Sequence, residues 1–172
     1  MGVSYEFYVG VGGYKFNYRA CCCCEEGDGK LECAGALFRF KELIGALRIL
    51  YFPPGGSIVV LEVICAGRDP SREMIESVLL EFNDMGQEVS RNLRKLRLAS
   101  EHSELISLRK QRMLREISYA KGDVRVGLKF ALHDMLMSGE RISVVEAKIF
   151  RDRIVALNIL IEDAEEALIA LD

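Results

Sequence analysis

The second half of the chain carries an apolar heptad pattern that suits packed helices and few other structures. A single heptad frame runs through residues 70–121, and eleven of its fourteen a and d positions are apolar. Over residues 147–171 the same spacing places an apolar residue at all eight such positions. An α-helix brings every third and fourth residue to one face, so each segment is expected to be a long helix with one apolar seam.

Turn and capping signals divide this helical region, residues 69–172, into separate helices. Gly122 interrupts the first apolar run, and Ser143 with Glu146 forms the capping-box pair that begins a last helix. The pattern turns polar near residues 100–103, where a bend or a reversal is expected. The sequence therefore predicts a helical hairpin or bundle with helices over 70–121, 124–137 and 143–171.

The first 68 residues are patterned differently, because apolar and polar residues alternate there as they do in β-strands. Glycines and prolines between the alternating segments supply turns. Strands are predicted over 3–9, 14–20, 31–40 and 57–66, with a helix over 41–52. The expected class is α+β, in which a small antiparallel β-β-β-α-β sheet over residues 1–68 precedes long coiled-coil-like helices.

Charge is distributed unevenly along a chain whose net charge is only −3. Residues 1–90 carry a net charge of −5, residues 91–129 a net charge of +7, and residues 130–172 a net charge of −5. Blocks of opposite sign can pack on one another, within one chain or between copies. A basic block also suits a polyanionic partner.

The apolar seams make association through helices the first functional hypothesis. The chain is expected to be a non-enzymatic assembly or interaction protein that forms a homodimer or joins a larger complex. The competing interpretation is an ordinary bundle, in which the seams pack on one another within one chain. Asn92, at a d position, would fix the register of a seam. The predicted interface consists of Ile75, Phe82, Val89, Asn92, Leu96, Phe150, Ile154, Leu157, Ile161 and Leu168.

A basic helix face is the second candidate site, for a nucleic acid. Such a stripe can follow a phosphate backbone, with an affinity that falls as salt rises. Only Tyr119 adds an aromatic ring within residues 91–129, so stacking on single-stranded bases is poorly supported. A solvated outer helix face is the simpler interpretation. The candidate contacts are Arg91, Arg94, Lys95, Arg97, Arg109, Lys110, Arg112 and Arg115.

Four consecutive cysteines, residues 21–24, follow the predicted second strand. If that strand paired with the third, Cys21, Cys23 and Cys33 would share one face of the sheet, as a thiol-redox or zinc site requires. No histidine lies near them in sequence, and cysteine often packs as a small buried residue. Packing is therefore the favoured interpretation, and no metal or cofactor is expected.

The residues favour binding over catalysis. His133 and Asp134 are neighbours on a predicted helix, where adjacent side chains do not face each other. No nucleophile motif or pair of carboxylates stands out. The chain begins without a signal-like segment and contains no apolar run of about 18 residues, so a cytoplasmic protein without a membrane span is expected.

Overall fold

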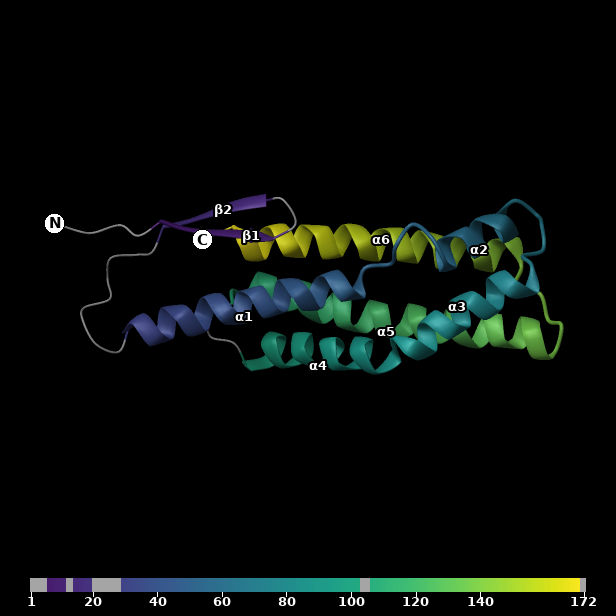
Figure 1. The fold of residues 1–172 in the computed structure, drawn as a ribbon. Helices are drawn as coiled ribbons and strands as arrows, with labels where there is room; N and C mark the ends of the chain where they lie inside the picture. The colour runs from purple at the N-terminus through teal and green to yellow at the C-terminus, as the bar shows by residue number, and fades with distance from the viewer. Residues whose placement is uncertain (1–5, 12–13, 20–28, 103–105, 171–172) are drawn as a thin grey trace. The chain divides into compact units, whose positions relative to one another are not determined.

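The computed structural model describes the backbone of residues 6–11, 14–19, 29–102 and 106–170, and the side chains of residues 40–101 and 106–170 (Figure 1). The chain divides into two compact units, residues 1–39 and residues 40–172. The division falls inside a helix, and not at residue 68 where the sequence pattern changes. Each unit is described by itself.

The first unit contains a β-hairpin and the beginning of a helix. Strand β1 (Glu6–Val11) pairs with β2 (Tyr14–Arg19) in an antiparallel register that joins Glu6 to Arg19. Alternating segments on both sides of a glycine-containing turn favour this pairing. Helix α1 (Gly29–Leu50) begins in this unit and ends in the second.

The predicted α+β class is wrong, because the third and fourth predicted strands are helical. Residues 31–40 form part of α1, and residues 57–66 largely form α2 (Ser57–Cys65). The 31–40 segment contains leucine, alanine and glutamate, which favour helices, and no β-branched residue. The sheet within the described residues has two strands, so the β-β-β-α-β arrangement does not form. From Gly29 onward the described chain is helical.

Helix α2 shows why a short apolar run is ambiguous between strand and helix. Leu61 and Ile64 are buried, whereas Val59 is 39% exposed, so one helical face meets the core. Gly67 follows the helix with a φ of 72°, a conformation that glycine adopts without strain. Its N–H donates to the Ile64 carbonyl oxygen at 2.9 Å, which ends the helix.

The single helix predicted over 70–121 is instead divided among α3 (Arg72–Asp84), α4 (Gly86–His102) and α5 (Leu108–Met137). The first break lies at Met85, beside a glycine, which weakens a helix. The chain then reverses between α4 and α5, which pack on each other, close to the polar stretch where a reversal was predicted. Helix α5 continues through Gly122, so the separate helix predicted over 124–137 is its second half.

Helix α6 (Val144–Ile169) occupies the segment predicted over 143–171, and it begins with the predicted capping box. The Ser143 hydroxyl oxygen accepts a hydrogen bond from the Glu146 N–H at 3.2 Å, and the Glu146 carboxylate accepts one from the Ser143 N–H at 2.9 Å. The hydrogen bonds from Ser143 lower the pKa of the Glu146 carboxyl. A local motif therefore fixes this helix start.

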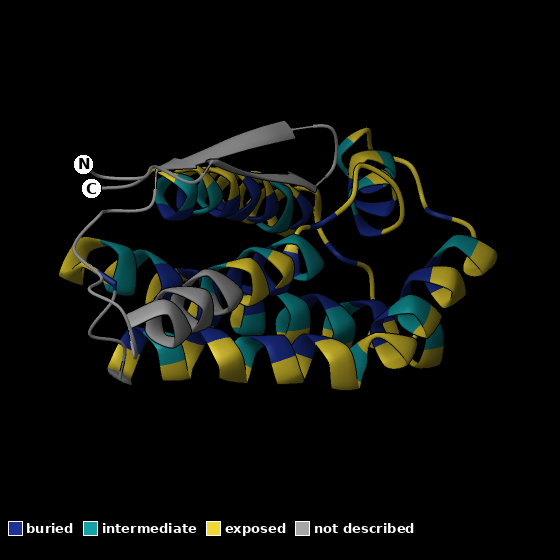
Figure 2. Ribbon diagram, turned by 60° about the vertical axis from the view of Figure 1, so that its left-hand side comes forward, coloured by how far each residue is buried: buried dark blue, intermediate teal, exposed yellow. Residues whose placement is uncertain are grey.

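Helix α5 lies at the centre of the second unit, since it packs against α3, α4 and α6, while α2 packs on α6. Leu128 and Leu132 of α5 are fully buried in one continuous core to which α1–α6 all contribute. Figure 2 shows the buried faces of these helices turned toward one another and the exposed faces turned outward. The apolar periodicity of the second half is thereby used for packing within the unit.

Candidate functional site

The residues of the predicted helix–helix interface lie in the chain's own core. Nine of the ten are buried, and Phe150 is half-buried. The Phe150 ring lies against Gly127 of α5, where a Cβ would stand 3.3 Å from it. Asn92 donates to the Glu88 carbonyl oxygen of its own helix at 2.9 Å. The seams are occupied by intrachain contacts, as in an ordinary bundle.

The predicted nucleic-acid contacts lie on α4 and α5, and seven of the eight are exposed. Lys110 is half-buried, and its Nζ donates to the Ala170 carbonyl oxygen at 3.3 Å, at the end of α6. Arg97 donates to the Ser118 hydroxyl at 2.9 Å and lies 5.7 Å from the centroid of the Tyr119 ring. The two paired helices carry what we call the basic face: Arg91, Arg94, Lys95, Arg97, Arg109, Arg112 and Arg115.

The second half of α6 carries exposed charges of the opposite sign. No lysine or arginine occurs in residues 154–172. Glu165 is half-buried and pairs with Arg48 of α1. The three exposed carboxylates form what we call the acidic face: Glu162, Asp163 and Glu166. The second unit therefore exposes mainly basic charges on α4 and α5, where Glu101 and Glu116 are also exposed, and acidic charges on the second half of α6.

The predicted thiol or metal site lies outside the side chains that the structure describes. Cys33 lies on α1, and Cys21 and Cys23 lie outside the described residues. The proposed cluster required residues 31–40 to be a strand, and this segment is helical. In the described part of the chain no group of three or more histidine, cysteine, aspartate or glutamate side chains is placed to hold a metal ion. Cys65 is a half-buried free thiol on α2.

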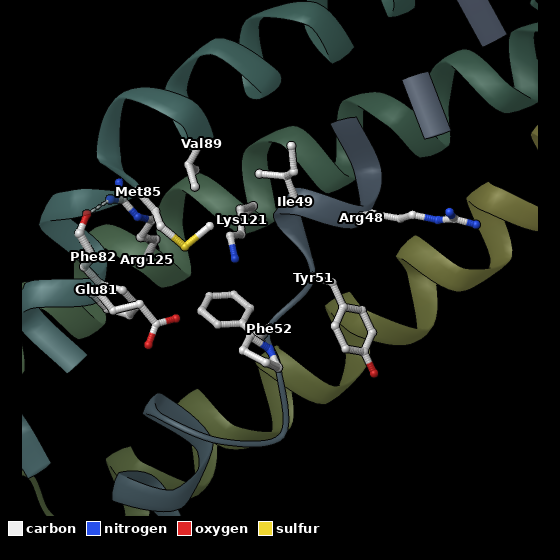
Figure 3. Close-up of a pocket in the computed structure, with 11 residues that line it drawn as sticks. Arg48, Ile49, Tyr51, Phe52, Glu81, Phe82, Met85, Val89, Lys121 and Arg125 are labelled. Atoms are coloured by element: carbon white, nitrogen blue, oxygen red, sulfur yellow. Dashed lines mark hydrogen bonds between the residues drawn. The ribbon is translucent and has the colours of Figure 1, made fainter. Parts of the chain in front are cut away.

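A cavity of about 260 Å³ lies between the end of α1, α3, the start of α4 and α5 (Figure 3). Apolar and aromatic side chains form most of its wall, and Lys121 of α5 lies at its centre. Lys121 is only 4% exposed. Lys121 is not among the residues predicted from the sequence, although the pattern contains a signal for it. Lys121 shares a helical face with Ile117, Val124 and Leu128, which are all buried.

The Lys121 amine has an unusual environment. Its Nζ lies 3.2 Å from the centroid of the Phe52 ring and donates no hydrogen bond to any described residue. Burial, with a smaller contribution from the Arg125 charge, lowers the pKa of Lys121 to about 7, while the Glu81 carboxylate acts in the opposite direction. The face of the Phe52 ring also attracts the charged form. Lys121 therefore loses its proton more readily than an ordinary lysine.

The two arginines that line the cavity are each engaged by another group. Arg125 Nη2 donates to the Phe82 carbonyl oxygen in the last turn of α3, and its guanidinium lies 5.7 Å from the centroid of the Phe82 ring. A cation at a helix C-terminus is favoured by the helix dipole. Arg48 points away from the cavity toward α6, where it pairs with Glu165. Lys121 lines the same cavity, and its Nζ is turned toward the Phe52 ring (Figure 3).

The Phe52 ring is held over Lys121 by a contact with α6. The Asn158 Oδ1 accepts from the Phe52 N–H at 2.9 Å, and the Asn158 Nδ2 donates to the Phe52 carbonyl oxygen at 2.8 Å. One buried amide thereby pairs both backbone groups of Phe52. These residues are 106 positions apart in sequence, so local patterns contain no signal for this contact.

No protein-family model, curated protein or solved structure matches this chain. None of the described helices combines the length and the apolar composition that crossing a membrane requires.

Proposed function

We propose that the protein is a non-enzymatic assembly protein that associates with further copies of itself, the basic face of one copy meeting the acidic face of another. The supporting observation is that the apolar seams are buried within the chain, while two faces of opposite charge are exposed. Association then depends on the charged faces and not on the heptad seams. We also propose a cytoplasmic location, which fractionation of native cells would test.

The neighbouring positions of the two faces suit a symmetric pair. The hydrogen bond between Lys110 and Ala170 joins the beginning of α5 to the end of α6, close to both faces. Two copies related by a two-fold axis would pair a basic face with an acidic face twice. Each contact between the faces would therefore occur twice in the dimer and contribute twice to the free energy of dimerisation.

Exposed apolar side chains accompany both sets of charges. On α6, Val155 and Ile159 precede Glu162 and Glu166 on the same helical stripe, and they are 47% and 52% exposed. Leu108 on α5 lies among the basic residues and is 73% exposed. Single exposed ion pairs contribute only about 0–1 kcal/mol each, so apolar contact is needed beside them. The charges would select the orientation and make the affinity fall with salt.

Charge-swapped variants test this proposal. The first carries Arg112→Glu with Arg115→Glu, and the second carries Glu162→Lys with Glu166→Lys. Like charges then face each other, so each variant alone is expected to be monomeric in light scattering at low salt. An equimolar mixture is expected to associate, because opposite charges meet again.

The matched control is Arg68→Glu, which reverses an exposed charge between α2 and α3, outside both faces. Its self-association is expected to equal that of the unmodified protein. Swapped variants that associate alone as the unmodified protein does, or a mixture that stays monomeric, would contradict the proposal.

A nucleic acid is the second candidate partner, favoured by the seven exposed cations of the basic face. A filter-binding titration with duplex DNA and RNA tests it, with an affinity expected to fall steeply with salt. The Arg112→Glu and Arg115→Glu variant is expected to lose binding and to lower the salt slope. Absence of salt-sensitive binding to either duplex would reject this candidate.

A further inference from the structure

We propose that the cavity around Lys121 binds a small monocarboxylate with an apolar body, whose carboxylate pairs with the Lys121 ammonium group. The site lies apart from the basic and acidic faces, and its function is independent of the proposed self-association.

The Lys121 residue is buried as a whole, while its amine nitrogen is open to the cavity. Lys121 is 4% exposed, it faces the cavity, and no described residue accepts a hydrogen bond from its Nζ. Glu81 is the one carboxylate among the lining residues, and it forms no ion pair with Lys121. A buried ammonium group costs several kcal/mol unless it is paired. An anion in the cavity would provide that partner.

The wall of the cavity selects among anions. Seven of the eleven lining residues are apolar or aromatic: Ile49, Tyr51, Phe52, Pro53, Phe82, Met85 and Val89. Of the three lining cations, Arg48 pairs with Glu165 and Arg125 donates to the Phe82 carbonyl oxygen, which leaves Lys121 as the one not engaged by an oxygen acceptor. A dianion such as phosphate would therefore lie against apolar walls and beside Glu81 with this amine as its main partner. A monocarboxylate matches the single amine, and an apolar body matches the walls.

The volume of the cavity limits the size of the ligand. About 260 Å³ lies below the range of roughly 300–1,000 Å³ that is typical of pockets for drug-sized molecules. The cavity is partly open, and two of its lining residues, Tyr51 and Met85, are each 36% exposed, so a small ligand has a path into it. Acids with one aromatic ring or one branched chain meet these conditions.

Ligand binding would be linked to protonation of Lys121. The charged and titratable groups around it are Arg125 on α5, Glu81 on α3, and Arg48 and Tyr51 at the end of α1, while α4 contributes the apolar Val89. A bound carboxylate favours the ammonium form and therefore raises the pKa of Lys121 above its free value of about 7. Binding at pH 8 is thus expected to take up a proton. Above pH 7 the affinity is expected to fall by up to about tenfold per pH unit.

Calorimetric titration of the full chain tests the site. The probes are phenylacetate, its neutral isostere phenylacetamide, and inorganic phosphate. Phenylacetate is expected to bind the unmodified protein, and phenylacetamide and phosphate to bind at least tenfold more weakly. Lys121→Met is expected to weaken phenylacetate binding at least tenfold. The control Lys129→Met, which changes a half-buried lysine of the same helix outside the cavity, is expected to leave it unchanged.

Several results would overturn the proposal. Equal binding of phenylacetate and phenylacetamide, or undiminished binding by Lys121→Met, would show that the amine does not recognise the ligand. Tighter binding of phosphate would refute the assigned ligand class. If phenylacetate does not bind the unmodified protein, the site is rejected. If Lys121→Met fails to fold, the unmodified protein is titrated with phenylacetate at pH 8 in two buffers of different ionisation enthalpy. Binding without uptake of a proton would then contradict the proposal.

Discussion

Two polar side chains, Lys121 and Asn158, lie where the surrounding helix faces are apolar, and their environments differ. The oxygen and the nitrogen of the Asn158 side-chain amide are both hydrogen-bonded to the backbone of Phe52. The amine of Lys121 lies against the face of the Phe52 ring and has no hydrogen-bond acceptor among the described residues. A paired buried polar group supports a structure, whereas an unpaired one lowers its stability. Asn158 is therefore expected to stabilise the fold and Lys121 to destabilise it.

Lys121→Met is expected to raise the free energy of unfolding at pH 7 by about 1–4 kcal/mol. The pKa of Lys121 is about 7 in the folded protein and 10.5 in the unfolded chain. Between these pH values the unfolded state binds more protons, so stability rises with pH and the cost of Lys121 disappears toward pH 10.5. Urea denaturation at pH 7 and pH 10 measures the change. A stability gain from Lys121→Met that is the same at pH 7 and pH 10 would contradict this account. So would a loss of stability at pH 7 that the control Lys129→Met does not show.

Asn158→Leu is expected to lower the free energy of unfolding by about 2–5 kcal/mol. Leucine leaves the Phe52 N–H and carbonyl oxygen unpaired in a buried place, at about 1–3 kcal/mol for each group. Urea denaturation measures the loss, and Asn83→Ala, which changes an exposed asparagine of α3, is the control. If Asn158→Leu costs no more than this control, the amide does not anchor Phe52.

Helix α5 shows how the context of an element decides where it ends. A glycine followed by an aspartate is a common helix stop, yet α5 passes through Gly122 because Leu114, Ile117, Val124 and Leu128 are buried on both sides of it. Burial of an apolar face outweighs the roughly 1 kcal/mol by which glycine disfavours a helix. Gly122 therefore remains a position of low helix propensity in the middle of α5.

Gly122→Ala is therefore expected to stabilise the protein by about 0.5–1 kcal/mol, since no atom lies within 4 Å of the added Cβ. Gly139→Ala is the matched comparison, because Gly139 follows α5 with a φ of 68° and alanine there is strained. Thermal unfolding is expected to show a higher Tm for the first and a lower Tm for the second. A lower Tm for Gly122→Ala would mean that the helix ends at this glycine.

The parts of the fold that the sequence predicts are those that depend on neighbouring residues. The capping box at Ser143 needs two residues three positions apart, and the structure contains it. Segments 31–40 and 57–66 could not be assigned this way, because a short apolar run suits a strand or a helix until its packing partners are known. The cavity could not be predicted from the sequence for the same reason, because Lys121 and Phe52 come into contact only when α5 and the end of α1 pack together.

At the scale of the whole molecule, the charge blocks of the sequence become two faces of the second unit. The +7 block supplies the basic face on α4 and α5, and the last −5 block supplies the acidic face on α6. The apolar periodicity that first suggested association is used within the chain, where nine of the ten predicted interface residues are buried. Association is therefore proposed to depend on charge, and salt is the variable that separates this account from one based on apolar seams.

Light scattering coupled to size exclusion, over a range of protein concentrations at low and at high salt, tests this central claim most directly. We predict a species of twice the 19.3 kDa chain mass at low salt, which dissociates to the monomer as salt rises. A monomer at every concentration and both salt levels would contradict the proposed assembly. So would a dimer whose stability does not change with salt.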